Sequence, residues 1–151
     1  MKPSHPIETK GTVYKTAVRP AMLYGSECWA TRKCDEQKMH VTEMKMLRWA
    51  GGVTKLDKIR NEYIRGTFKV AEIQHKMQEN RLRWFGHIMR RNEDHMTRQV
   101  MAMEEGKRGR GRPPTTWMRT VSKDLKTLCL TPEMTQNRQE WRISIRRADP
   151  K

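Results

Sequence analysis

The chain lacks a long hydrophobic run and a recognisable export signal. No apolar stretch among its 151 residues approaches the roughly 20 residues needed to cross a bilayer. The opening MKPSHPIE does not have the charged-then-apolar order of a secretory signal. The three cysteines, Cys28, Cys34 and Cys129, cannot all pair, so a reducing compartment is expected. We therefore expect a soluble nuclear or cytoplasmic protein with no membrane partner.

Clustered carboxylates, which hold catalytic metal ions in polymerases and nucleases, are also missing. The aspartates are scattered one to a segment, at Asp35, Asp57, Asp94, Asp124 and Asp149. The acidic and histidine side chains at 93–95 lie together, but a solvated helix end is favoured over a metal or acid–base site. Cys28, Cys34 and His40 are spaced too widely for a zinc finger, which favours buried free thiols. The sequence predicts no catalytic residue, no metal site and no cofactor.

Negative charge is scarce relative to positive charge. Lysine and arginine number 32 against 17 aspartates and glutamates, which gives a net charge of +15. The mean hydropathy of -0.97 indicates a small hydrophobic core. Such a chain attracts polyanions over a Debye length of about 8 Å, and nucleic acid is the commonest polyanion. An anionic membrane surface is less favoured, because no single helix combines a basic face with a wide apolar face.

No segment alternates polar and apolar residues with the period of a strand, whereas several show helical spacing. The sequence predicts an all-α fold: an irregular helical bundle, plus a C-terminal helix pair joined to it by a basic Gly/Pro linker. The predicted helices are 12–29 with a break at Pro20, 35–50, 54–66 with Leu56 and Tyr63 inward, 70–90, one capped by Thr116, and one opened by Thr131 and Pro132. The predicted divisions are a disordered lead-in (1–10), a helical domain (11–105), the linker (106–115) and the helix pair (116–151).

The run NRLRWFGHIMRR could lay arginines along a phosphate backbone and offer an aromatic ring to a base. Trp84 and Phe85 fall at helical spacing with Met77 and Ile88, so the hydrophobic core is the favoured place for both rings. The guanidinium groups are then the surface contribution of this helix. Its predicted nucleic-acid-binding residues are Arg81, Arg83, Arg90 and Arg91.

The linker GKRGRGRPP contains the core of an AT-hook, in which an extended Arg-Gly-Arg lies in the narrow minor groove of A·T-rich DNA. Non-specific phosphate contact by the same residues is favoured over sequence-selective reading. The predicted binding residues here are Lys107, Arg108, Arg110 and Arg112. In the C-terminal pair, Trp117 and Trp141 are predicted core residues. For the arginines at 138, 142, 146 and 147, solvated charge and nucleic-acid contact are equally favoured.

Five ordered blocks carry a resemblance to a known family: YKTAVRPAMLYGSECWA (14–30), KMLRWAGGVTKLDKIRNEYIR (45–65), RLRWFGHIMRR (81–91), RGRGRPPTTW (108–117) and RQEWRISIRRADP (138–150). Together they resemble the C-terminal, thumb and post-thumb part of the endonuclease and reverse transcriptase polyprotein of non-LTR retrotransposons, of the RTE or BovB-like type. The resemblance covers nearly the whole chain after residue 10.

The resemblance implies a thumb-like role, in which helices follow the phosphate backbone of an RNA/DNA hybrid or duplex DNA beside a reverse transcriptase palm. The family's catalytic aspartates lie in a Tyr-Ala-Asp-Asp motif, which this sequence lacks, so we expect no enzyme activity from the isolated chain. One alternative is a domesticated or decayed fragment that binds chromatin or a protein through its AT-hook-like arm. Another is an enzyme fragment that functions only with a palm supplied in trans.

Overall fold

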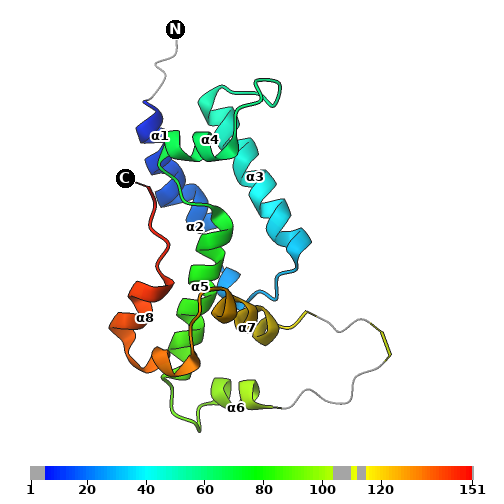
Figure 1. Cartoon of the computed structure of the whole chain (residues 1–151), viewed down its shortest axis with the longest axis vertical. Coiled ribbons are helices and arrows are strands. Elements are labelled where there is room, and N and C mark those ends of the chain that lie inside the picture. The colour runs from blue at the N-terminus through cyan, green and yellow to red at the C-terminus, as the bar shows by residue number, and fades with distance from the viewer. Residues whose placement is uncertain (1–5, 104–109, 112–114, 151) are drawn as a thin grey trace. The chain divides into compact units, whose positions relative to one another are not determined.

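The computed structural model describes residues 6–103, 110–111 and 115–150 (Figure 1). The predicted all-α class is confirmed, because these ranges contain helices and no strand. None of the helices in these ranges is both long and apolar enough to span a membrane. The α-helices are α1 (Ile7–Val13), α2 (Arg19–Met22), α3 (Lys33–Gly51), α4 (Asn61–Phe68), α5 (Ile73–Met89), α6 (Met96–Ala102), α7 (Trp117–Thr127) and α8 (Arg138–Ile145).

The chain forms two compact units whose boundary differs from the predicted one. The first unit contains residues 6–24, 33–77 and 147–150 of the described chain, and the second contains 25–32 and the described part of 78–146. The boundary therefore falls inside α5 and not at the basic linker. Helices α7 and α8 share a core with the second half of α5, so they are not the separate C-terminal pair that the sequence predicted.

In the first unit, the predicted disordered lead-in is wrong for its last residues, since α1 begins at Ile7. A β-carbon at Gly11 would lie 2.3 Å from the carbonyl oxygen of Phe68, so glycine allows α1 to approach the end of α4 closely. A π-helical turn links α1 to α2. Pro20 lies in α2, directly after this turn, and the helix ends at Met22 and not at the predicted residue 29.

The core of the first unit contains a buried carboxylate. Glu43 is fully buried and accepts hydrogen bonds from the Tyr14 hydroxyl at 2.9 Å and the Arg65 Nε at 3.2 Å. Burial and the adjacent Glu43 raise the pKa of Tyr14, so the phenol remains a neutral donor. The charge of Glu43 is thus balanced among the apolar residues of this core, which are Tyr14, Met44, Leu47, Ile64, Phe68 and Val70.

The prediction of a helix over 54–66 is wrong for its first half. The Thr54 amide and hydroxyl donate to Asp57 Oδ2 at 2.6 and 2.8 Å, and this turn replaces helical hydrogen bonds. Helix α4 begins only at Asn61. Leu56 and Tyr63, both predicted inward, are 89% and 70% exposed.

The C-terminal segment of the first unit is held by a charged contact. Asp149 accepts from both terminal nitrogens of Arg19, at 2.6 and 2.9 Å, and from the Ala71 amide at 2.8 Å. Burial alone would raise the pKa of Asp149, but the Arg19 and Ala71 hydrogen bonds outweigh it and lower that pKa.

Replacing Asp149→Asn should lower the free energy of unfolding by about 1.5–3 kcal/mol at pH 7, because a charge-assisted hydrogen bond is lost. The folded-state pKa is depressed, so the stabilisation is complete above the ordinary value of about 3.9 and disappears as the pH falls below it. Urea denaturation at pH 7 and pH 3 measures both effects. The exposed Asp94→Asn is the control, and equal midpoints for the two variants at pH 7 would contradict the assignment.

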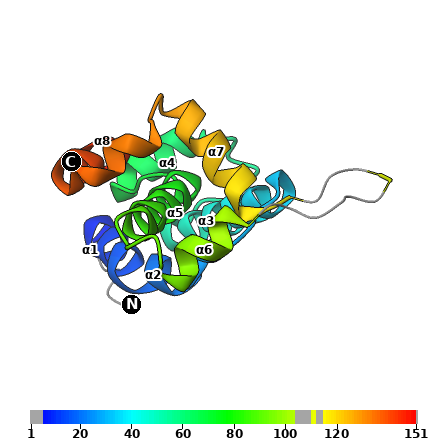
Figure 2. The ribbon, with the colours of Figure 1, turned by 90° about the horizontal axis from the view of Figure 1, so that it is seen from below.

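The second unit is built around α5, with α7 and α8 beside its second half (Figure 2). The buried core residues are Leu82, Phe85, Val121, Leu125, Trp141 and Ile145. The predicted cap at Thr116 is confirmed, since its hydroxyl accepts from the Arg119 amide. Pro132 opens only a short 3-10 turn, and the side chain of Asn137 caps α8 instead of the predicted Thr131.

Gly86 is the point of α5 on which Trp141 lies. A β-carbon there would be 2.3 Å from the indole nitrogen, which donates to the Leu82 carbonyl at 3.1 Å. Gly86→Ala should therefore lower stability by about 1–2 kcal/mol despite the better helix propensity of alanine, because the buried indole must shift. The matched control is Gly66→Ala in α4, where the new methyl group meets nothing within 4 Å and should add roughly 0.5–1 kcal/mol. An increase in the urea midpoint for both variants would contradict this packing.

Candidate nucleic-acid interface

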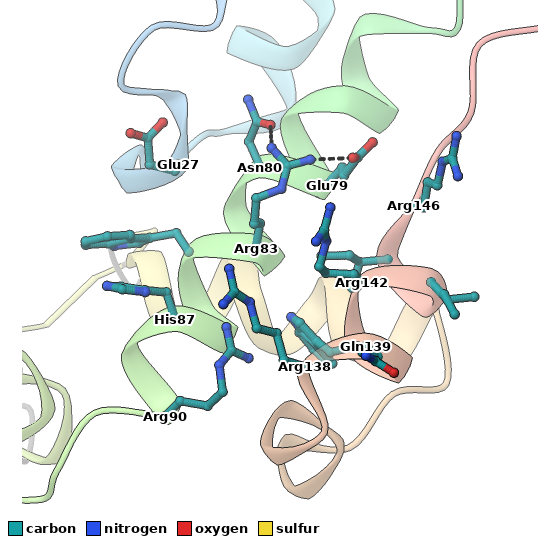
Figure 3. Close-up of a pocket in the computed structure, with 14 residues that line it drawn as sticks. Glu27, Glu79, Asn80, Arg83, His87, Arg90, Arg138, Gln139, Arg142 and Arg146 are labelled. Carbon is teal, nitrogen blue, oxygen red and sulfur yellow. Dashed lines mark hydrogen bonds and ion pairs between the residues drawn. The ribbon is translucent and has the colours of Figure 1, made fainter.

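A large groove runs over α5 and α8 of the second unit (Figure 3). It has a volume of about 1540 Å³ and is open to solvent, unlike the enclosed pockets that bury most of a small molecule. Guanidinium groups from both sides of the groove gather here. We call this feature the arginine groove, after Arg83, Arg90, Arg138, Arg142 and Arg146.

Helix α8 is amphipathic, and this positions its arginines. Trp141 and Ile145 are buried against the core of the second unit, whereas Arg138 and Arg142 are exposed four residues apart, one helical turn. Arg146 follows directly after the helix end and lines the same groove. The predicted basic side of the last helix is thus confirmed for these three arginines. The neighbouring Arg147 is half-buried and belongs to the first unit.

Positive charge in the arginine groove is only partly balanced. Arg83 forms an ion pair with Glu79 at 2.5 Å, and Arg90 donates to a backbone carbonyl, that of Thr135, at 2.8 Å. The other three groove arginines form no ion pair within the described part of the chain. With Glu27 and Glu79 as its acidic lining residues, the groove carries five positive and two negative charges, a net +3.

The crowding of like charge alters the titration of groove residues. Desolvation and the nearby Arg138 lower the pKa of Arg90, although an arginine stays charged at physiological pH. Desolvation, together with Arg91, Arg90 and Arg138, lowers the pKa of His87, so its imidazole is neutral at pH 7. An anionic ligand would relieve this repulsion.

The two adjacent aromatic residues of α5 differ in environment. Phe85 is buried, at 3% exposure, as predicted. Trp84 is only half-buried, so the prediction that places it in the core is wrong: its ring stacks on that of exposed His87, with centroids 5.3 Å apart and 20° between planes. The rings of Trp84 and His87 line the arginine groove, whereas that of Phe85 does not.

The prediction that Arg81 binds nucleic acid at the surface is wrong. This side chain is 1% exposed and donates to Asp124 Oδ2 at 2.6 Å and to the Thr31 hydroxyl at 2.9 Å. Its guanidinium therefore neutralises a buried carboxylate. Helical phase could have indicated this, because the position lies four residues after Met77 and four before Phe85 on the apolar face of α5.

The remaining predicted binding residues lie elsewhere. Arg91 is exposed and contacts His87 Nε2 at 3.0 Å, but it does not line the groove. Arg110 is exposed. Lys107, Arg108 and Arg112 lie outside the described residues. The sequence prediction omitted the α8 arginines from its binding set, although their spacing opposite Trp141 and Ile145 could have indicated them.

No group of three or more histidine, cysteine or carboxylate side chains in the described ranges is placed to hold a metal ion. The cysteines are free, as predicted, but Cys28, Cys34 and Cys129 are exposed and not buried. This arrangement offers guanidinium donors and stacked rings to a ligand, which is chemistry suited to binding an anionic polymer.

Comparison with known proteins gives one informative similarity. The chain is 28% identical over 148 residues to an uncharacterized protein of Caenorhabditis elegans that is described as transposon-derived. The similarity covers 89% of this chain and 53% of that protein, so the chain spans about half the length of this relative. No protein family matches the chain, and no solved structure does. The similarity supports a transposon origin.

Proposed function

We propose that this chain is a non-catalytic nucleic-acid-binding fragment of a retrotransposon reverse transcriptase, and that the arginine groove contacts the phosphate backbone of template and primer. The observation that carries the proposal is the gathering of five arginines in α5 and α8 or directly after them, three of them without an acidic partner among the described residues. The similarity to a transposon-derived protein supports the origin of such a fragment. The block resemblance of the sequence supports its place after the palm.

Guanidinium groups suit this role because each presents a planar set of donors that matches two phosphate oxygens. Contacts to phosphates fix the position of a nucleic acid without reading its sequence. The proposed ligand is therefore defined by its backbone charge, and RNA/DNA hybrid and duplex DNA should bind with similar affinity. Each phosphate bound releases counterions, which makes the affinity fall steeply with salt.

Fluorescence anisotropy with an RNA/DNA hybrid, a mixed-sequence duplex and an A·T-rich duplex tests the proposal. Three to five phosphate contacts predict a decrease in affinity of roughly 40- to 500-fold between 50 and 200 mM salt for all three ligands. A lack of binding at 50 mM salt, or an affinity independent of salt, would contradict the proposal.

Two other outcomes would favour a different function for the chain. A strong preference for the A·T-rich duplex that Arg112→Ala abolishes would favour a chromatin interaction module acting through the AT-hook-like arm. Primer extension is expected to be nil for the isolated chain. Extension that appears when a separate palm is added would assign the chain to a split enzyme, whereas extension by the chain alone would contradict its non-catalytic role.

A further inference from the structure

The Trp84–His87 stack is the most distinctive feature of the arginine groove. Trp84 lines the groove and also a second pocket of about 420 Å³, which is formed largely by apolar side chains such as Ile88, Met101 and Trp117. His87 (Figure 3) is exposed, and its ring lies within 20° of parallel to the indole of Trp84, with the two ring centroids 5.3 Å apart. A core role does not account for a half-buried indole stacked on an exposed imidazole.

The chemistry of the stack suits a flat neutral ligand. Desolvation and the surrounding arginines lower the pKa of His87, and Arg91 lies 3.0 Å from its Nε2, where a neutral imidazole can accept a hydrogen bond. The stack therefore presents neutral aromatic surface directly beside cationic side chains. Arg83 of α5 and Arg90, which directly follows the end of that helix, line the same groove.

Aromatic surface flanked by arginines is the pattern by which proteins bind unpaired bases, since the ring stacks on the base while the cations contact the adjacent phosphates. Inside a continuous duplex, each base already stacks on its neighbours and presents only its edges and backbone to a protein. A duplex would thus use the groove arginines and leave the Trp84–His87 stack unused.

We propose that the Trp84–His87 stack receives one unpaired base, so that the arginine groove binds a single strand, or the single-stranded end of a primer–template, more tightly than a continuous duplex. This inference rests on the proposed function, because the same groove must hold the phosphates. It adds a ligand class that backbone contacts alone do not select.

The test compares two strands with equal charge: a ten-residue oligothymidylate and a ten-residue strand of abasic sites, each binding the full chain at fixed salt. The wild type should bind the base-bearing strand roughly 5- to 150-fold more tightly, the range for stacking one base. Trp84→Ala should remove this preference, so that the variant binds the two strands about equally. Trp84→Phe keeps an aromatic ring and should retain part of the preference.

A second readout needs no variant and is therefore independent of folding defects. An oligothymidylate with one fluorescent 2-aminopurine should be quenched when the wild type binds, because stacking on an aromatic ring quenches this base. Binding of neither strand would overturn both the inference and the proposed function. Equal binding of both strands by the wild type, with unquenched 2-aminopurine, would overturn the base-stacking inference and leave the phosphate-binding groove intact.

Discussion

Replacing Arg138 and Arg142 together by glutamate is expected to weaken nucleic-acid binding by roughly 200-fold or more at 50 mM salt. At this salt concentration, each phosphate contact contributes about 15-fold in affinity relative to 1 M salt. Two lost contacts multiply to about 200-fold, and two new carboxylates add repulsion. The fold should persist, because both side chains are exposed and form no ion pair within the described residues. Anisotropy against an RNA/DNA hybrid measures the effect.

The matched control replaces Lys123 and Lys126 of α7 by glutamate. These lysines are exposed and belong to the same unit, but they do not line the arginine groove. Both double variants lower the net charge by 4, from +15 to +11, so a general attraction would respond equally to each. We expect less than about a fivefold decrease for the lysine variant. Equal weakening by the two variants would show that net charge, and not the groove, binds the ligand.

Arg81→Ala is expected to lower the free energy of unfolding by about 3–5 kcal/mol. The reason is that Asp124, only 5% exposed, would lose its charged partner and remain buried. Gln78, at 3.1 Å from the other carboxylate oxygen, is a neutral donor and cannot compensate for the charge. Chemical denaturation followed by tryptophan fluorescence gives the stability of the variant.

A second variant identifies the cause of that loss. Replacing Arg81→Met and Asp124→Leu together removes both charges, so it should recover most of the stability lost by Arg81→Ala. The control is Arg142→Ala, which should change stability by less than about 1 kcal/mol, because this side chain is exposed and forms no ion pair within the described residues. Unchanged stability of Arg81→Ala combined with lost nucleic-acid affinity would contradict the structural role and restore the surface prediction for this residue.

Helix ends could be predicted where a capping or left-handed residue in the local sequence begins or ends the helix. Gly52, with a positive φ of 67°, follows the last residue of α3, so this helix ends within one residue of its predicted end at 50, and Thr116 caps α7 as predicted. The prediction was wrong where a residue far along the chain determines the local structure or the division into units. The lead-in becomes helical because Gly11 lies against Phe68, far along the chain, and the two-unit division depends on long-range contacts that spacing does not reveal.

The site was predictable to the extent that charge and helical phase separate exposed from buried positions. The helical repeat of 3.6 residues places Arg81 on the apolar face of α5 and Arg83 on its exposed face. The sequence prediction considered only the charge of these two residues. The convergence of Arg83 with Arg138 and Arg142 could not be predicted, because it depends on how Trp141 lies on Gly86. That contact holds α8 against α5 and so brings together arginines separated by more than fifty residues in the sequence.

The arginine groove is the surface that we propose binds the nucleic acid. A nuclear magnetic resonance titration of the ¹⁵N-labelled chain with a short oligonucleotide tests this proposal most directly, because each arginine Nε–H and each indole N–H gives its own resonance. We expect early shifts for Arg138, Arg142 and the Trp84 indole, with the resonance of the buried Arg81 unchanged. Shifts confined to the first unit or to the neighbourhood of Arg110, with the groove resonances unchanged, would contradict it.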